Sequence, residues 1–238
     1  MIVHAGGRVK HMTTAMNEVL AGSFASVAPT LARQKSRVLV ASGRREGILP
    51  AEPRREFHPE LDLWVCATGG AFAGSKIDIG TRLLLEHLDE MAPTARTAID
   101  LGCGTGVLAA ALARSRPELA VIASDQSEAA VASARATMEA NGLADRVQVR
   151  RDDALDAAEP GSAELVVLNP PFHVGSTVHA GIALKLFGAA GRTLAPGGQL
   201  WTVFNSHLAY RAALQRAVGE TRQVARNAKF TVMVSTKR

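Results

Sequence analysis

Cysteine is scarce in this sequence, and long apolar runs are absent from it. The 238 residues include two cysteines, Cys66 and Cys103, too few for a disulfide scaffold, and we expect both to be reduced thiols. No apolar run approaches the roughly 18–20 residues of a membrane-spanning helix. The opening MIVHAGGRVK lacks the apolar core of a secretory signal, and no metal-ligand spacing is visible. These absences predict a cytoplasmic protein with no membrane partner and no metal.

Positive charge is concentrated in the first quarter of the chain. The net charge is +5, and the isoelectric point is about 9.7. Residues 1–60 hold nine Lys and Arg against five Glu, a net charge of +4, whereas residues 61–238 hold 18 against 17, a net charge of +1. A basic segment beside a nearly neutral one suggests an anionic partner such as nucleic acid. The alternative is a solvated surface that only aids solubility.

Strand-like and helix-like segments alternate from about residue 94 onward. Such alternation predicts an α/β fold, with a mostly parallel sheet, helices on both faces and right-handed crossovers. The alternating tail, residues 221–238, is typical of a terminal antiparallel hairpin. The expected strands are 95–104, 119–125, 147–153, 164–171 and 199–206, and the expected helices are 107–116, 127–142, 179–194 and 210–219.

Residues 1–60 give weaker signals. Residues 13–24 have helical spacing and residues 36–42 have the composition of a strand. Residues 44–60 are rich in proline and charge, which favours a linker. We therefore expect two parts, a basic segment over 1–60 and a catalytic-type domain over 61–238.

The first strand of the alternating region ends in a glycine-rich turn, DLGCGTG. Gly102, Gly104 and Gly106 allow the backbone to turn tightly and to approach a ligand at a helix N-terminus. Asp100 repels a pyrophosphate but suits a cationic amino-acid group. The order D-x-G-x-G-x-G resembles motif I of class I S-adenosylmethionine methyltransferases, whose cofactor carries such a group.

Acidic residues also follow the next two strands. Asp125 ends the second strand, where an acid can accept hydrogen bonds from ribose hydroxyls. The resemblance to these methyltransferases implies that Asp153 accepts from the adenine amine, with Asp152 as the weaker candidate. Alone, each acid could equally be a helix cap or a turn residue. Together with the glycine turn, they predict a site for S-adenosyl-L-methionine.

The fourth strand stops at Asn169-Pro170-Pro171-Phe172. Prolines cannot donate to a strand ladder, and the acceptors expected in this turn are the Asn169 amide oxygen and the Pro170 carbonyl. Phe172 adds a flat face for stacking on a base. Two acceptors and a ring suit a planar exocyclic amine. The residues resemble the [N/D/S]-P-P-[F/Y/W] motif of amino-methyltransferases, which implies catalytic roles for Asn169, Pro170 and Phe172.

Four segments together resemble the bacterial ribosomal RNA guanine-N2 methyltransferases of the RsmC/RlmG type. The resemblance covers about residues 60–238. It implies a Rossmann-like class I fold with a seven-stranded sheet and methyl transfer to a guanine N2 amine in 16S or 23S rRNA, either naked or in an assembled subunit. It also implies a monomer in which residues 1–60 are the remnant or end of an auxiliary RNA-binding domain. The segments are GSKIDIGTRLLLEHL, DLGCGTGVL, NPPFH and NSHLAYRAALQRAVG…ARNAKFTV.

The same resemblance suggests roles for a few other residues. The segment with Asp78, Gly80 and Thr81 is a candidate to close over the cofactor, although a helix N-cap at Thr81 is an equal alternative. His173 is either a substrate contact or a surface histidine. Lys229 and Phe230 are candidates to lie near the RNA, with a core role favoured for Phe230. Cys103, inside the glycine turn, is expected to pack rather than to act as a nucleophile.

Two other functions remain open from the sequence. One is an enzyme with the same turn but another acceptor, either a protein glutamine methyltransferase or an adenine-N6 methyltransferase. The other is a catalytically silent RNA-binding or assembly module. The intact glycine turn and the intact Asn-Pro-Pro-Phe turn argue against the silent module.

Overall fold

The structure is a computed structural model that describes residues 1–46, 53–171 and 180–238. The chain divides into two compact units, Met1–Glu52 and Pro53–Arg238. Phe172 and His173 lie outside the described residues, so the roles expected for them stay predictions.

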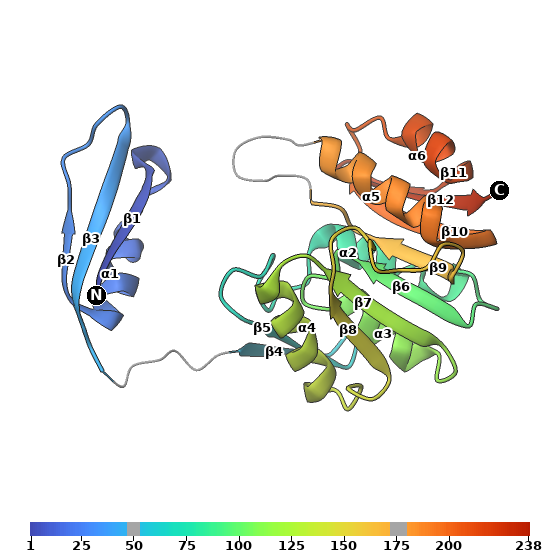
Figure 1. The fold of residues 1–238 in the computed structure, drawn as a ribbon, viewed down its shortest axis with the longest axis horizontal. Helices are drawn as coiled ribbons and strands as arrows, with labels where there is room; N and C mark the ends of the chain where they lie inside the picture. Colours follow the sequence, from blue (N-terminus) through green and yellow to red (C-terminus); the bar gives the residue numbers. More distant parts are fainter. Residues whose placement is uncertain (47–52, 172–179) are drawn as a thin grey trace. The chain divides into compact units, whose positions relative to one another are not determined.

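The first unit is a small antiparallel sheet with one helix (Figure 1). The expected helix is α1 (Thr14–Ser23), and the expected strand is β3 (Ser36–Arg44), so both predictions are confirmed. Two further strands, β1 (Ile2–Arg8) and β2 (Phe24–Pro29), flank β3 in the order β1-β3-β2, and the short helix η1 spans Val9–His11. These two strands were not predicted, because β1 contains glycines and β2 lacks a regular apolar pattern. Their pairing with β3 stabilises them.

The second unit begins earlier than the composition predicted. Residues Arg54–His58 form strand β4, which pairs with β5 (Leu63–Ala67), so the prediction of a linker over 44–60 is wrong for this segment. Four of the five β4 residues are exposed, which explains why the segment has the composition of a linker. Pairing with apolar β5, and the stacking of the Arg55 guanidinium 4.0 Å above the Trp64 ring, hold it in place.

Within the described residues, the core of the second unit is a seven-stranded sheet in the order β11-β12-β10-β9-β6-β7-β8 (Figure 1). The four pairings from β8 to β10 are parallel, whereas β12 is antiparallel to both β10 and β11. The predicted fold and its antiparallel terminal hairpin are therefore confirmed. The strands are β6 (Thr97–Leu101), β7 (Ala120–Asp125), β8 (Val147–Arg151), β9 (Ala163–Leu168), β10 (Leu194–Asn205), β11 (Gly219–Arg226) and β12 (Phe230–Lys237).

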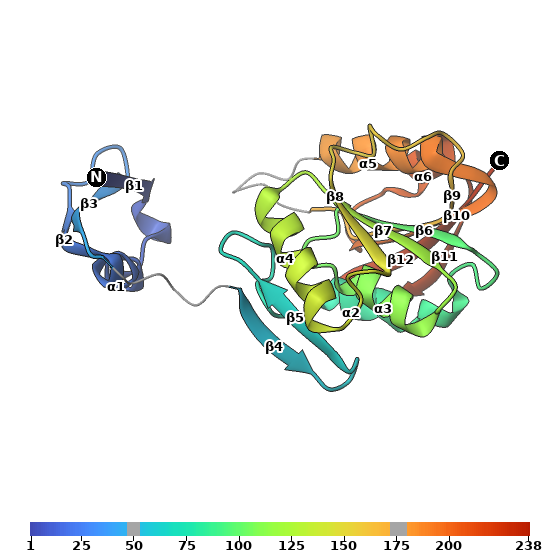
Figure 2. The ribbon, with the colours of Figure 1, turned by 60° about the horizontal axis from the view of Figure 1, so that its bottom comes forward.

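Helices cover both faces of this sheet (Figure 2). One face carries α2, α3 and α4, and the other carries α5 and α6. Side chains of β9 alternate between them: Leu165 and Val167 join the first core, and Val166 and Leu168 join the second. A strand apolar on both faces belongs in the middle of a sheet. The helices are α2 (Ile79–Leu85), η2 (Leu88–Glu90), α3 (Val107–Ser115), α4 (Glu128–Ala140), α5 (Ala180–Thr193) and α6 (Arg211–Ala217).

Strand β5 is joined to helix α4 by a ladder of side-chain bonds. Asn141 bonds both backbone groups of Trp64, Thr137 bonds both backbone groups of Cys66, and Ser133 accepts from the Thr68 N–H. Four helical residues rise about 6.0 Å and two strand residues about 6.6 Å, so the two periods match. The ladder satisfies an otherwise open strand edge and anchors the loop that follows it.

Candidate active site

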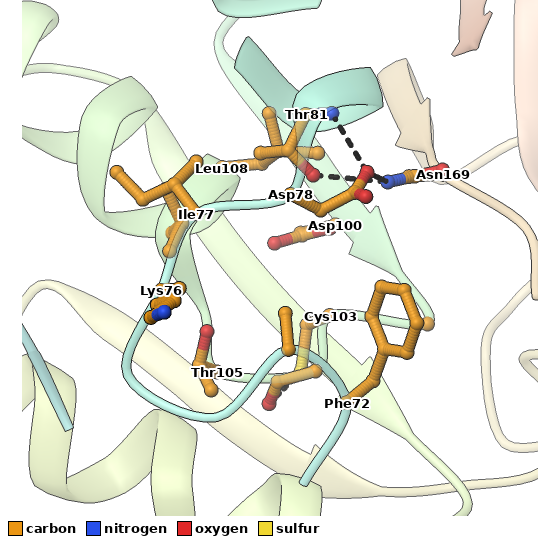
Figure 3. Close-up of a pocket in the computed structure, with 14 residues that line it drawn as sticks. Phe72, Lys76, Ile77, Asp78, Thr81, Asp100, Cys103, Thr105, Leu108 and Asn169 are labelled. Carbon is orange, nitrogen blue, oxygen red and sulfur yellow. Dashed lines mark hydrogen bonds between the residues drawn. The ribbon is translucent and has the colours of Figure 1, made fainter. Parts of the chain in front are cut away.

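An open pocket lies where the carboxyl ends of β6 and β9 meet the segment before α2 (Figure 3). The space between its walls is roughly 450 Å3 when the volume open to solvent is counted. Its lining brings together residues from three separate parts of the sequence. These residues are Phe72, Ala73, Lys76, Ile77, Asp78, Thr81, Asp100, Gly102, Cys103, Gly104, Thr105, Val107, Leu108 and Asn169.

The predicted glycine turn forms the floor of this pocket. Its backbone adopts φ values of +70° at Gly102, +54° at Gly104 and +78° at Gly106, a conformation that side chains rarely allow. A Cβ at Gly102 or Gly104 would meet open space, so a ligand can approach the backbone there. A Cβ at Gly106 would lie 2.9 Å from the Met138 Cε, so this glycine instead lets α3 pack against α4.

Asp100 is almost fully buried beneath the turn. Its Oδ2 accepts from the Ala109 N–H at 3.0 Å, in the first turn of α3. Burial raises the pKa of Asp100 to about 7, the Ala109 bond opposes the rise, and the negative charge of Asp125 adds to it. A cation placed in the pocket would favour the ionised carboxylate.

Asp125, at the end of β7, braces the glycine turn. One carboxylate oxygen accepts from the Gly104 N–H at 3.0 Å, and the other accepts from the Ser127 N–H at 2.9 Å. Asp125 is not among the residues that line the pocket. Each oxygen keeps a second lone pair, so the side chain can still accept from a ribose, and that role stays a prediction.

The two acids after β8 have different surroundings. The carboxylate of Asp153 is exposed and pairs with the Lys185 ammonium of α5 at 2.7 Å. Asp152 accepts from the Ala157 N–H at 3.2 Å and so closes its own turn. Neither lines the pocket, and the adenine contact expected of Asp153 stays a prediction.

Asn169 lies at the opposite wall, directly after β9. Its Nδ2 donates to Asp78 Oδ2 at 3.0 Å and to Thr81 Oγ1 at 2.9 Å. Its Oδ1 is buried and, within the part of the chain that is described, has no hydrogen-bond partner. An orphaned buried acceptor is costly, by about 1–3 kcal/mol, and calls for an explanation. The structure thus leaves free the oxygen that the sequence assigns to an incoming amine.

Pro170 is buried next to Asn169, and neither it nor Gly106 is among the pocket-lining residues. Cys103 is nearly buried, and burial raises the pKa of its thiol, in keeping with packing rather than nucleophilic chemistry. Phe230 is buried in the core, as favoured, whereas Lys229 is exposed.

The N-cap of α2 is not the residue that one of the predicted alternatives gave. Asp78, not Thr81, is the N-cap of α2, and its Oδ2 accepts from the Gly80 and Thr81 N–H groups. The Thr81 hydroxyl faces Asn169 instead (Figure 3). An N-cap at Thr81 is therefore wrong, because aspartate three residues earlier takes that role. The position of Asp78 and Thr81 in the pocket wall is compatible with cofactor contact, which stays a prediction.

Sequence reasoning missed the part of the wall contributed by Phe72, Ala73 and Lys76. Phe72 is 68% exposed, and Ala73 adopts a φ of +61°. The small residues of GGAFAGSK were a turn signal, but nothing in them indicated a pocket. The Lys76 ammonium gives the pocket a positive group beside its two acids, Asp78 and Asp100.

The strand order together with the glycine turn after β6 defines a Rossmann-like class I methyltransferase fold. A family model described as "Methyltransferase small domain" matches residues 62–234. The chain belongs to this family, and the resemblance inferred from its motifs is confirmed.

Known relatives match most or nearly all of the chain. The ribosomal RNA large subunit methyltransferase G of Streptomyces coelicolor is 42% identical over 169 residues, 71% of this chain and 44% of that protein. The protein of the same name from Pseudomonas paraeruginosa is 38% identical over 237 residues, 99% of this chain and 63% of that protein. The chain thus spans less than two thirds of either relative.

A solved structure is similar over the whole length. It is the T. thermophilus 16S rRNA N2 G1207 methyltransferase (RsmC), in complex with AdoMet and guanosine. The TM-score is 0.80 at 26% sequence identity, covering 100% of this chain and 65% of that one. Among the described residues of the present chain, no helix is long and apolar enough to cross a membrane.

Proposed function

We propose that this protein transfers a methyl group from S-adenosyl-L-methionine to the exocyclic N2 amine of a guanine in 16S or 23S ribosomal RNA. The observation that carries the proposal is the Oδ1 of Asn169, which is buried and unbonded among the described residues and belongs to a residue that lines the glycine-turn pocket. We further propose a cytoplasmic monomer that acts on naked rRNA or on an assembled subunit.

The residues of the pocket fit this cofactor. Gly102 and Gly104 leave their backbone open, and the buried carboxyl of Asp100 lies close to where a cationic amine would bind. Lys76 can face the carboxylate of the methionine part. Outside the lining of the pocket, Asp125 and Asp153 are the proposed acceptors for ribose and adenine. When bound, S-adenosylmethionine supplies an electrophilic methyl group on a sulfonium.

The acceptors of Asn169 and Pro170 explain how the weakly nucleophilic amine of guanine is prepared for methyl transfer. The lone pair of an exocyclic amine is conjugated with its ring, so the amine attacks poorly unless its N–H groups are held. The Asn169 oxygen and the Pro170 carbonyl would accept those N–H groups and direct the lone pair at the methyl group. Most of the acceleration then comes from positioning. A paired base hides its amine, so the target guanine must be unpaired or flipped out.

Guanine in rRNA is favoured over the other acceptors by the names of the relatives. The T. thermophilus protein is named as an N2 G1207 methyltransferase of 16S rRNA, whereas the two relatives from Streptomyces and Pseudomonas are named as large subunit methyltransferases. These names support rRNA as substrate and leave both 16S and 23S as candidates. A protein glutamine methyltransferase or an adenine-N6 methyltransferase would use the same Asn-Pro-Pro-Phe turn, but the names of these relatives do not support either function.

The test is a methyl-transfer assay across acceptors. The purified chain would be incubated with labelled S-adenosylmethionine and, in separate reactions, unmodified 16S rRNA, 23S rRNA, assembled subunits, a release factor and DNA. We expect label in rRNA as N2-methylguanosine, identified by mass spectrometry of nucleosides. Label in release factor or DNA alone would replace the proposed acceptor. Cofactor binding with no transfer to any acceptor would favour the silent module.

For the first unit we propose RNA binding through phosphates. Arg8, Lys10, Arg44 and Arg45 are exposed there, and residues 1–46 carry seven Lys and Arg against two Glu. Replacing those four by Gln should lower rRNA affinity and reduce the slope of log affinity against log salt by up to about 0.9 per lost contact. Cofactor affinity should survive. An unchanged slope would leave this charge as solvated surface.

A further inference from the structure

The Asn169 carboxamide is held on its nitrogen side only. The Nδ2 group has two N–H bonds to give, and both are taken, by the Asp78 carboxylate at 3.0 Å and by the Thr81 hydroxyl at 2.9 Å. The oxygen has no partner among the residues that the structure describes. All three side chains meet at one wall of the pocket (Figure 3).

This contact set selects one orientation of the amide. A carboxylate only accepts hydrogen bonds, so rotating the carboxamide by 180° would place two oxygens against each other. The Thr81 hydroxyl can donate or accept, so the Asp78 carboxylate alone decides the orientation. The nitrogen therefore faces α2, and the oxygen must face the other way.

Gly80 makes room for this arrangement. The Asp78 carboxylate folds back over Gly80, where a Cβ would lie 3.0 Å from Asp78 Oδ2 and 3.2 Å from the Phe230 Cε1. Phe230 is buried in the core at the start of β12 and cannot move aside freely. A side chain at this position would displace the carboxylate from the N-cap, from Asn169, or from both.

We infer that Asp78 and Thr81 are positioning residues, which fix the Asn169 carboxamide so that its free oxygen meets the amine to be methylated. The inference deepens the proposed function and rests on it. In this arrangement one carboxylate, that of Asp78, both caps α2 and orients the Asn169 carboxamide. In this inference Thr81 acts through Asn169, whereas the cofactor contact that the family resemblance suggested for it stays a prediction.

Two pairs of variants separate this role from the alternatives. Thr81→Val removes the hydroxyl and keeps the shape, while Thr81→Ser keeps the hydroxyl. Asp78→Ser keeps an N-cap acceptor but is too short to reach Asn169, while Asp78→Asn keeps an oxygen within reach. If capping α2 were the only role of Asp78, the Asp78→Ser variant would behave like the wild type, because serine is also a good N-cap residue.

The kinetic expectation is a loss in kcat with little change in binding. Under saturating cofactor, kcat should fall about 3- to 10-fold for Thr81→Val, the loss of a neutral hydrogen bond, and about 10- to 100-fold for Asp78→Ser, the loss of a charged acceptor. Thr81→Ser and Asp78→Asn should each recover most of the rate. The cofactor Kd should stay within about 2-fold for Thr81→Val. A Kd that rises as much as kcat falls would make Thr81 a cofactor contact and overturn the inference.

A double-mutant cycle tests whether both residues act through Asn169. In an Asn169→Ala background, Thr81→Val and Asp78→Ser should change the remaining rate by no more than about 2-fold, because the group that they orient is gone. Full, additive losses in that background would overturn the inference.

One measurement is independent of catalysis. In the cofactor-free protein, NMR should show the Asn169 side-chain amide protons exchanging slowly with solvent, and Thr81→Val should speed up that exchange. Protons that exchange as fast as those of an exposed asparagine would refute the positioning role. A wild type that shows slow exchange but methylates no acceptor would instead refute the proposed function.

Discussion

The two sides of the pocket satisfy their polar groups in opposite ways. On the glycine-turn side, both Asp125 oxygens and one Asp100 oxygen accept from backbone N–H groups of the adjacent turns. On the Asn-Pro-Pro side, the Asn169 nitrogen is fully bonded, and its oxygen has no partner in the described part of the chain.

This difference separates two kinds of preorganisation. The acids on the glycine-turn side hold the backbone in shape and keep spare lone pairs for a ligand, so a cofactor adds to an already satisfied network. On the Asn-Pro-Pro side, the Asn169 oxygen has no partner among the described residues, so an incoming N–H can donate to it. Groups held ready in this way cost no reorganisation at the moment of reaction.

A substitution on the Asn-Pro-Pro side should have the largest effect, and it should act on the rate of methyl transfer. Asn169→Ala removes its side-chain acceptor, so single-turnover transfer to rRNA should fall by about 10²–10³, equivalent to ~2.7–4 kcal/mol of barrier. Cofactor affinity, measured by calorimetry on the same protein, should change little because the glycine turn is intact. Transfer at the wild-type rate would remove Asn169 from catalysis.

Breaking the glycine-turn side should act on binding instead. Asp125→Ala removes an acceptor for ribose and the brace on Gly104, so cofactor affinity should fall by about 1.5–3 kcal/mol, the range for hydrogen bonds to a charged group. Calorimetry of the folded variant gives the value. Glu118→Ala, an exposed acid before β7, is the matched control and should bind normally. Equal affinity of both variants would show that the ribose site is misassigned.

Asp100 should make stability depend on pH. Its pKa is raised to about 7 in the folded state by burial, whereas the unfolded carboxyl ionises near 3.8. Between these values the folded state binds the extra proton, so this group makes the free energy of unfolding fall as pH rises, by about 1.4 kcal/mol per pH unit, and the fall stops above pH 7.

The matched variant is Asp100→Asn, which has no proton to lose and can still accept from Ala109. Urea unfolding at pH 5, 6, 7 and 8 gives the difference between variant and wild type. That difference should grow in favour of the variant up to pH 7 and then level off. Parallel pH profiles would mean that Asp100 titrates normally.

Much of the fold could be predicted because its signals are local. Alternating apolar segments, some with glycine or asparagine stops such as Asn141-Gly142 after α4, predicted the elements from β6 to β12. Strand β4 escaped prediction because four of its five residues are exposed and most are polar, and its stability comes from β5 and the α4 ladder across about 70 residues of sequence. Long-range pairing leaves no local pattern to detect.

The site was predictable where the backbone conformation demands a residue type, and less so where side chains meet. Gly106 and the Asn169-Pro170 turn stand out in the sequence for conformational reasons. The bonds from Asn169 to Asp78 and Thr81 join residues about 90 positions apart. A motif resemblance placed Thr81 near the cofactor, but only the fold shows it bonded to Asn169.

The smallest effect is expected at Asp153, which offers an adenine acceptor but now pairs with Lys185 in solvent. Exposed ion pairs contribute little, so adenine can replace the lysine at low cost. Asp153→Ala should weaken cofactor binding about 2- to 10-fold, less than for a buried bond to a charged group because this carboxylate is exposed to solvent, and should leave thermal stability nearly unchanged. A cofactor analogue without the adenine amine should bind wild type and Asp153→Ala equally well. The control, Asp152→Ala, loses its bond to Ala157 and should affect stability rather than affinity. If Asp152→Ala weakened binding and Asp153→Ala did not, the adenine acceptor would be Asp152, and the exposed pair would be surface only.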